Sequence, residues 1–152
     1  MIVRRAGLKG RNEDGREWLY YSDTGGLTQF GAYVETLQSG VPPNDKHWHE
    51  KEDEVLYLLA GELTVLEGDT EETLHPGDAA CWPAGTAIAH TIANRSAAPC
   101  TYLIIGTRVT HDVCHHPDSG QVLYTEGEDW RVEGPDGRIL RSGRCKSPPG
   151  RD

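Results

Sequence analysis

Short apolar and alternating runs, separated by turn residues, recur roughly every ten residues along most of the chain. Runs of this kind, bounded by Gly, Pro, Asn and Asp, are typical of β-strands, and no stretch carries a 3.6-residue apolar period with helix caps. The predicted strands are Trp18–Tyr21, Thr28–Leu37, Val55–Ala60, Glu62–Glu67, Glu71–Leu74, Ala79–Trp82, His90–Asn94, Thr101–Thr107 and Gln121–Thr125. The pattern therefore predicts an all-β fold, either a sandwich or a barrel.

Composition narrows the choice of partners and compartment. The 152 residues include 15 basic and 24 acidic side chains, for a formal charge of −9. We expect no nucleic-acid partner and no membrane partner, because phosphate-rich surfaces select a basic face. No apolar run approaches the ~20 residues of a membrane helix, and the N-terminus has no secretory pattern. The cysteines are far apart and form no CxxC pair, which favours reduced thiols in a cytoplasmic protein; they are Cys81, Cys100, Cys114 and Cys145.

The segment His47-Trp48-His49 is the first candidate for chemistry. On a strand, residues i and i+2 share a face, whereas on a helix they point to nearly opposite sides. A strand is favoured here because a double proline precedes the segment. His47 and His49 can then aim two imidazoles at one point, with Trp48 facing away. Two convergent neutral imidazoles suit a divalent transition-type metal.

Two further residues complete a candidate metal site. Strict alternation from His49 places Glu54 on the opposite face, but a turn or bulge in the polar stretch 50–53 restores it to the same face. His90 opens another predicted strand, after the turn at residues 83–85. Asp53 is the alternative carboxylate, because strand registers slip easily by one residue.

The spacing of these residues resembles the two sequence motifs of the cupin superfamily. The stretch Gly40-x6-His47-x-His49-x4-Glu54-x6-Gly61 resembles the first motif, and Gly77-x5-Pro83-x-Gly85-x4-His90-x3-Asn94 resembles the second. Fifteen residues separate Gly61 from Gly77. The departures are one extra residue before His47 and two between Gly85 and His90, and all four ligand-type residues are present.

A group of small bacterial single-domain cupins, often described as sugar-phosphate-isomerase-like or polyketide-cyclase-like, is similar over residues 27–125. The segments that carry this likeness are Leu27-Thr28-Gln29-Phe30-Gly31, Glu52-Asp53-Glu54, Asn94-Arg95-Ser96 and Ile105-Gly106-Thr107-Arg108. That group usually carries Tyr-Pro-Asp after the barrel, where this chain has His116-Pro117-Asp118.

The resemblance implies a cupin jelly roll, that is, a double-stranded β-helix forming an antiparallel barrel. We expect an N-terminal arm and first strand over 1–26, the barrel over 27–125, and a C-terminal extension over 126–152 whose end is loose from Gly143 onward. It also implies one divalent metal ion per chain on His47, His49, Glu54 and His90. Zinc is the preferred ion, with iron, manganese and nickel as alternatives.

Single-domain cupins commonly dimerise, and the segment 18–37 gives an independent reason to expect a homodimer here. It holds more large apolar side chains than one small barrel needs: Trp18, Leu19, Tyr20, Tyr21, Phe30 and Tyr33. A strand laid on a neighbouring subunit would bury them and cover a sheet edge. The alternative is that these side chains cap the subunit's own barrel.

Other candidate residues receive structural interpretations. His111, His115 and His116 are expected to be exposed in a loop after the barrel, and Asn94 to organise a turn. Side chains expected to pack in the core are Cys81, Cys100, Trp82, Tyr57 and Tyr102.

The functional prediction is a metal-dependent enzyme acting on a small oxygen-rich or anionic molecule. An open metal position would act as a Lewis acid on a carbonyl or hydroxyl oxygen, giving isomerase or lyase chemistry. A redox metal in the same shell would support dioxygen chemistry instead. The alternatives are a metal-containing binding or sensor protein without turnover, and a closed structural site. The sequence assigns no catalytic residue beyond the metal ligands.

Overall fold

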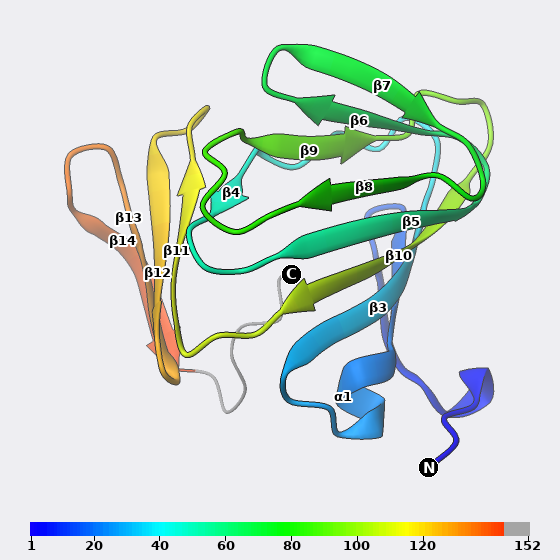
Figure 1. Cartoon of the computed structure of the whole chain (residues 1–152), viewed down its shortest axis with the longest axis horizontal. Helices are drawn as coiled ribbons and strands as arrows, with labels where there is room; N and C mark the ends of the chain where they lie inside the picture. The colour runs from blue at the N-terminus through cyan, green and yellow to red at the C-terminus, as the bar shows by residue number, and fades with distance from the viewer. Residues whose placement is uncertain (145–152) are drawn as a thin grey trace.

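Antiparallel β-strands form nearly all the regular structure of residues 1–144, the part of the chain that the computed structural model describes (Figure 1). The exceptions are a 3-10 turn, η1 (Arg5–Gly7), and a five-residue helix, α1 (Tyr21–Gly25). The strands are β1 (Lys9–Glu13), β2 (Arg16–Tyr20), β3 (Phe30–Leu37), β4 (Trp48–His49), β5 (Glu54–Ala60), β6 (Leu63–Glu67), β7 (Thr70–Leu74), β8 (Ala79–Trp82), β9 (His90–Ala93), β10 (Cys100–Thr107), β11 (His111–His116), β12 (Gln121–Glu126), β13 (Asp129–Glu133) and β14 (Ile139–Arg144). The predicted all-β class is confirmed.

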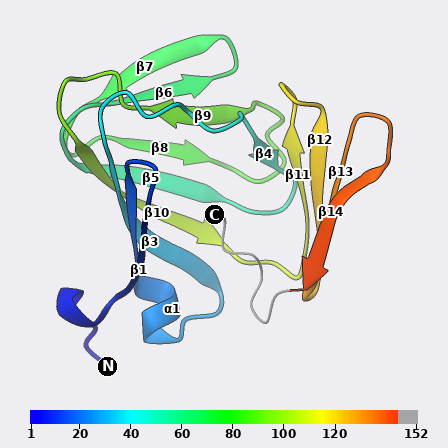
Figure 2. The same ribbon diagram turned by 180° about the vertical axis from the view of Figure 1, so that it is seen from behind.

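The strands form three sheets (Figures 1 and 2). A six-stranded sheet, β1-β2-β3-β10-β5-β8, lies against a three-stranded sheet, β7-β6-β9, and the two form the predicted jelly roll. Its hydrogen-bond ladder is not continuous, so the barrel is open rather than closed. A five-stranded sheet, β14-β13-β12-β11-β4, stands across one end. Residues 126–144 of the predicted extension belong to this sheet, and the rest of the predicted loose end, with Cys145, lies outside the described residues.

Every strand predicted from the apolar pattern is present, with its ends shifted by one or two residues at most. The strand expected at His47–His49 is present as β4, which has only two residues. Three strands of the same sheet, β11, β13 and β14, were not predicted. β11 is rich in histidine, a residue more typical of loops. The arm begins with a β1–β2 hairpin whose turn holds Asp14 at φ 49° and Gly15 at φ 80°. Two positive φ angles are what a two-residue hairpin turn needs, and Asp-Gly supplies them.

The core consists of the inward-facing residues of the jelly-roll strands. Leu56, Leu58 and Tyr102 are fully buried, as are Leu37 on β3 and Leu63 on β6. Each leucine contributes roughly 2 kcal/mol by leaving water. The predicted burial of Trp82 and Cys100 is also confirmed.

Two residues predicted to lie in the core are on the outer face instead. Tyr57 is 42% exposed, because it lies between inward-facing Leu56 and Leu58 on the same strand. Cys81 is exposed on β8, where it pairs with Val55 of β5. The strand alternation that buries their neighbours therefore turns both side chains outward.

A buried ion pair ties the arm to the loop that leads into the candidate site. Arg16 on β2 donates to Glu35 on β3 over 2.8 Å, and both side chains are buried. The same guanidinium donates to the Pro42 carbonyl over 3.0 Å. The double-proline loop before His47 is thus fixed to the barrel wall.

Gly61 provides a test of how tightly the barrel turns are packed. It has φ +81°, and a Cβ there would lie 2.7 Å from the Pro99 carbonyl oxygen. Gly137 has φ +76° with nothing within 4 Å, so it isolates the cost of the backbone angle. Gly61→Ala should lower the free energy of unfolding by about 3 kcal/mol, against about 1 kcal/mol for Gly137→Ala, in urea denaturation. Equal losses in the two variants would contradict the close contact with Pro99.

Candidate metal centre

Backbone hydrogen bonds hold the His47–His49 segment on both sides. The His47 N–H donates to the His90 carbonyl over 3.0 Å, and the His90 N–H donates to the His47 carbonyl over 2.9 Å. On the other side β4 pairs with β11, which places Cys114 opposite His49. The segment therefore connects the three-stranded sheet to the five-stranded sheet.

The side chains of this segment point as the strand geometry predicts. The ring centroids of His47 and His49 are 5.2 Å apart. Trp48 faces the other way and stacks on His115, with a centroid separation of 4.2 Å. The imidazoles of His47 and His49 therefore point to the same side of the strand, opposite to Trp48.

Glu54 joins them because the chain leaves strand geometry between β4 and β5. Residues 50–53 form no strand, so Glu54 begins β5 on the inward face with Leu56. Asp53 is exposed, and its Oδ1 accepts the Ala84 N–H over 2.8 Å. The alternative carboxylate is thus engaged with the 83–85 turn, and Glu54 is the carboxylate that the structure brings to the histidines.

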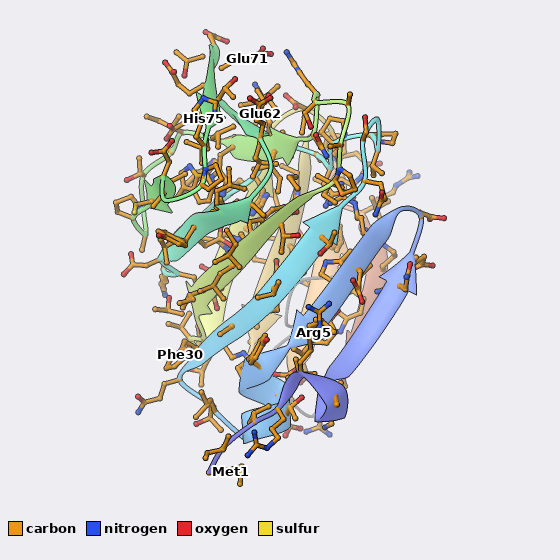
Figure 3. The ribbon with its side chains drawn as sticks, turned by 90° about the vertical axis from the view of Figure 1, so that its right-hand side faces the viewer. Met1, Arg5, Phe30, Glu62, Glu71 and His75 are labelled. Atoms are coloured by element: carbon orange, nitrogen blue, oxygen red, sulfur yellow. The ribbon has the colours of Figure 1, made fainter. Side chains whose placement is uncertain are left out.

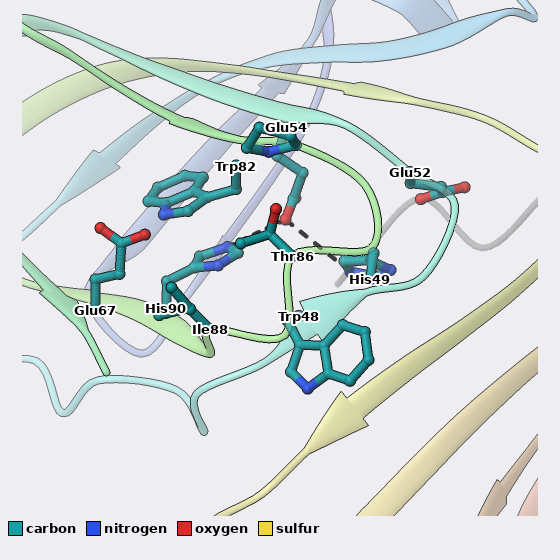
Figure 4. Close-up of a pocket in the computed structure, with 10 residues that line it drawn as sticks. Trp48, His49, Glu52, Glu54, Glu67, Trp82, Thr86, Ile88 and His90 are labelled. Atoms are coloured by element: carbon teal, nitrogen blue, oxygen red, sulfur yellow. Dashed lines mark hydrogen bonds and ion pairs between the residues drawn. The ribbon is translucent and has the colours of Figure 1, made fainter. Parts of the chain in front are cut away.

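Three imidazole nitrogens surround one carboxylate oxygen of Glu54. Glu54 Oε2 lies 3.2 Å from His90 Nε2, 3.4 Å from His47 Nε2 and 4.0 Å from His49 Nε2. Figure 4 shows His90 and His49 directed at this carboxylate from opposite sides. All four residues predicted as ligands are therefore brought together.

The donor set fits a divalent first-row metal ion. Nitrogen donors and a carboxylate converging from separate strands are the ligands such ions take. His49 Nδ1 is 2.5 Å from Asp112 Oδ2, which directs its Nε2 toward Glu54. His90 stacks on Trp82 at 3.8 Å, and burial, with neighbouring His47, lowers its pKa to about 3. A neutral imidazole is the form that binds a metal.

The site opens to solvent on the side of His47. The side chain of His47 is 24% exposed, whereas His49, His90 and Glu54 are nearly inaccessible. Behind the ligands, a cavity of about 10 Å³ lies between Trp82, Thr86 and Ile88 (Figure 4). It has room for roughly one water molecule. His47 is thus the candidate ligand most open to solvent.

The prediction that the histidines of residues 111–116 lie exposed in a loop is wrong, most clearly for His116. His111, His115 and His116 lie on strand β11, and of the three only His111 is exposed. The ring of His116 is 5.8 Å from that of His47, centroid to centroid, and its Nε2 is 3.6 Å from Cys114 Sγ. Burial, with a contribution from His47, lowers the pKa of His116. This imidazole stands beside the ligands on their open side.

Asn94 is a turn residue, as predicted. Its side-chain amide is buried and donates to the Leu37 and Ala98 carbonyls over 2.9 and 2.8 Å, while its Oδ1 accepts the Ser96 N–H. It therefore closes the β9–β10 connection rather than lining the site.

Asp112 was not predicted as part of the site, and His116 was predicted to be an exposed loop residue. Both lie on β11 with Cys114, at every second position of His111–His116, and so share one face. That alternation is visible in the sequence. What the face meets depends on the pairing of β11 with β4, which no local pattern signals.

Comparisons with known proteins agree with this architecture. Residues 33–106 match the sequence profile of the cupin domain. A crystal structure from Silicibacter pomeroyi, described as a sugar phosphate isomerase from a cupin superfamily, superposes with a TM-score of 0.83 at 27% identity, covering 93% of this chain and 97% of that one. One from Acidithiobacillus ferrooxidans, described as a candidate sugar phosphate isomerase, gives 0.74 at 26% identity, covering 88% and 89%.

A more distant structure shows the fold alone. The polyketide cyclase from Streptomyces resistomycificus superposes with a TM-score of 0.57 at 23% identity, covering 70% of this chain and 78% of that one. No curated protein matches the chain significantly in sequence.

The protein is thus a small antiparallel jelly roll with a His/Glu cluster at its open end that could hold a metal ion. The match of residues 33–106 to the cupin domain and the likeness to a crystal structure from the cupin superfamily both support a cupin fold for this chain. No helix among residues 1–144 is long and apolar enough to cross a membrane.

The convergent donors predict metal content directly. Purified protein should contain close to one divalent ion per chain, and His49→Ala and His90→Ala should each lose most of it, as measured by elemental analysis. His111→Ala is the control, because that imidazole is exposed on the same chain and should leave the content unchanged. Full retention in both ligand variants would mean that the ligand set is wrong.

Proposed function

We propose that the protein is a metal-dependent enzyme acting on a small oxygen-rich substrate, with His47, His49, Glu54 and His90 holding the ion. The convergence of three Nε2 atoms on one buried carboxylate oxygen carries this proposal. A bound ion would supply Lewis-acid polarisation of a carbonyl or hydroxyl oxygen. We expect zinc, with iron, manganese or nickel as alternatives, because imidazole and carboxylate donors accommodate all four.

The favoured reaction is isomerisation of a hydroxy-carbonyl compound. Moving a carbonyl along a carbon chain requires a group that takes a proton from one carbon and returns it to the next. His116 stands beside His47 on the exposed side of the ligands, where a substrate would enter. We assign it the role of carrying that proton.

The substrate class follows from the two structural neighbours that are similar over nearly their whole length. Both are described as sugar phosphate isomerases, one of them as a candidate. Aldose and ketose phosphates are oxygen-rich and anionic, and they carry adjacent hydroxyl and carbonyl oxygens. They are therefore the first compounds to test.

Two other functions are compatible with the same ligands. A binding or sensor protein needs the ion but no proton carrier, so the placement of His116 favours an enzyme over it. Dioxygen chemistry requires a redox-active ion in the same ligand set. Both are outcomes of the experiment that follows.

Solvent-exchange measurements test the proposed reaction. Metal-loaded protein in D₂O should catalyse deuterium incorporation next to the carbonyl of an aldose or ketose phosphate, followed by proton NMR. His116→Gln should slow exchange by about 100-fold or more while metal content is retained. His115→Gln is the matched control, since that ring stacks on Trp48 on the opposite face of β11.

The same experiment separates the alternatives. Tight binding of the sugar phosphate without exchange would identify a binding protein. Oxygen consumption by the iron-loaded protein, without exchange, would identify an oxygenase. Equal effects of His116→Gln and His115→Gln would remove His116 from the reaction.

The cysteines support a cytoplasmic location, which we also propose. Among the described residues Cys81, Cys100 and Cys114 are free thiols, and none forms a disulfide. Buried reduced thiols persist in a reducing compartment.

The outer face of the six-stranded sheet supports a homodimer. It faces the viewer in Figure 3. Residues directly opposite one another form two adjacent rows, Leu19–Val34–Leu103–Tyr57–Ala79 and Ala32–Ile105–Val55–Cys81. A contiguous apolar patch of this kind marks an interaction surface, and a second copy is the commonest occupant.

Segment 18–37 contributes to this face in a different way from that predicted. Leu19, Ala32 and Val34 point outward with the rows described above. Trp18 pairs with buried Glu35, and Tyr20 pairs with Tyr33, so these aromatic side chains point to the inner face. The proposed dimer therefore uses the aliphatic positions of the segment together with Phe30, which is exposed and shares the face of Ala32 and Val34.

Light scattering with size-exclusion chromatography tests the dimer. The wild-type protein at micromolar concentration should have twice the mass of one chain, and Leu103→Glu should halve it by placing a charge in the interface. Ile139→Glu is the control, because Ile139 is 61% exposed on β14, away from this sheet. A monomeric wild-type protein would overturn the proposal.

A further inference from the structure

Asp112 lies outside the residues that match the cupin domain, yet its side chain reaches the metal centre. It is on β11, in the five-stranded sheet, and its side chain is 5% exposed. Oδ2 is 2.5 Å from His49 Nδ1, and Oδ1 accepts the Lys51 N–H over 2.9 Å. Both carboxylate oxygens are therefore engaged, one with a ligand and one with the backbone that follows it.

We propose that Asp112 is a positioning residue that fixes the tautomer and the ring orientation of His49. A carboxylate facing Nδ1 makes that atom the proton-bearing donor, so Nε2 presents its lone pair toward Glu54. The Lys51 N–H holds the carboxylate in place while it does so. The inference deepens the proposed function and rests on it for the identity of His49 as a metal ligand.

The other two histidines are oriented differently. His90 stacks on Trp82 with ring planes 4° apart, and His47 is held by its backbone bridge to His90. The ring of His49 faces a carboxylate of the five-stranded sheet. Loss of Asp112 should therefore affect one ligand and leave the other two in place.

A second ion held by His49 and Asp112, with Glu52 nearby, is the other interpretation of this contact, and the distance favours a direct hydrogen bond over it. The two atoms are 2.5 Å apart, which is a hydrogen-bond length. An ion bound to both would need about 2 Å to each atom and would push them further apart. The neighbouring carboxylate of Glu52 accepts the Val109 N–H over 3.2 Å. Asp112 therefore acts on His49 and not on an ion of its own.

The test uses Asp112→Asn, with two readouts. The first is the tautomer of His49 in the metal-free protein, from long-range proton–nitrogen NMR of the imidazole ring. Wild type should carry the proton on Nδ1, and the variant should shift it toward Nε2, because an amide can donate to Nδ1. The second is zinc affinity, by competition with a chromophoric chelator, which should fall about 10- to 100-fold.

Asp118→Asn is the matched control. It makes the same acid-to-amide change on an exposed residue in the turn that follows β11, and should alter neither readout. If Asp112→Asn fails to fold, Asp112→Ser is measured instead, because its hydroxyl is small enough for the same site. Thermal unfolding of each variant confirms that the folded protein is compared.

The outcomes separate this inference from the proposed function. An unchanged Nδ1 proton in folded Asp112→Asn overturns the positioning role, whatever the zinc affinity. A shifted tautomer with unchanged zinc affinity would show that zinc binding does not depend on the His49 tautomer. That result would overturn the role of Asp112 in metal binding. A wild-type protein that binds no zinc overturns the proposed metal function, while the NMR measurement still decides the role of Asp112.

Discussion

The burial of the Glu54 carboxylate among three imidazole rings is the constraint on which the open end of the barrel depends. A carboxylate removed from water costs several kcal/mol unless positive charge or hydrogen-bond donors compensate it. Here the compensating groups come from β9, β4 and the loop before it, and Glu54 itself from β5. The two sheets of the jelly roll and the β4 segment must therefore meet at this one oxygen.

The ligands are held by contacts of different kinds, which makes the site stiff on one side and open on the other. Trp82 fixes the plane of His90, and Asp112 faces the far nitrogen of His49. His47 is the most exposed of the candidate ligands. Its ring lies near that of His116, so both imidazoles stand on the side where the proposed substrate would enter.

Much of this arrangement could be predicted from the sequence, because it depends on local alternation. The strand period placed His47 and His49 on one side, and motif spacing identified Glu54 and His90. The choice between Asp53 and Glu54 required the structure, since it turns on the hydrogen bond from Ala84 to Asp53. Asp112 and His116 could not be placed, because their position follows from pairing between β11 and β4, distant segments with no shared local signal.

The pairing of β4 with β11 also determines when the centre can form during synthesis. His49 and Asp112 are 63 residues apart in the chain, and β4 has no ladder partner among the described strands other than β11. Domains fold as the chain emerges, N-terminal parts first, and long-range pairs close late. The jelly-roll strands up to β10 can therefore collapse while the two-residue ligand strand still lacks its ladder. The proposed centre, with Asp112 against His49, can be complete only when the polypeptide has grown past its last candidate ligand, His90, to β11.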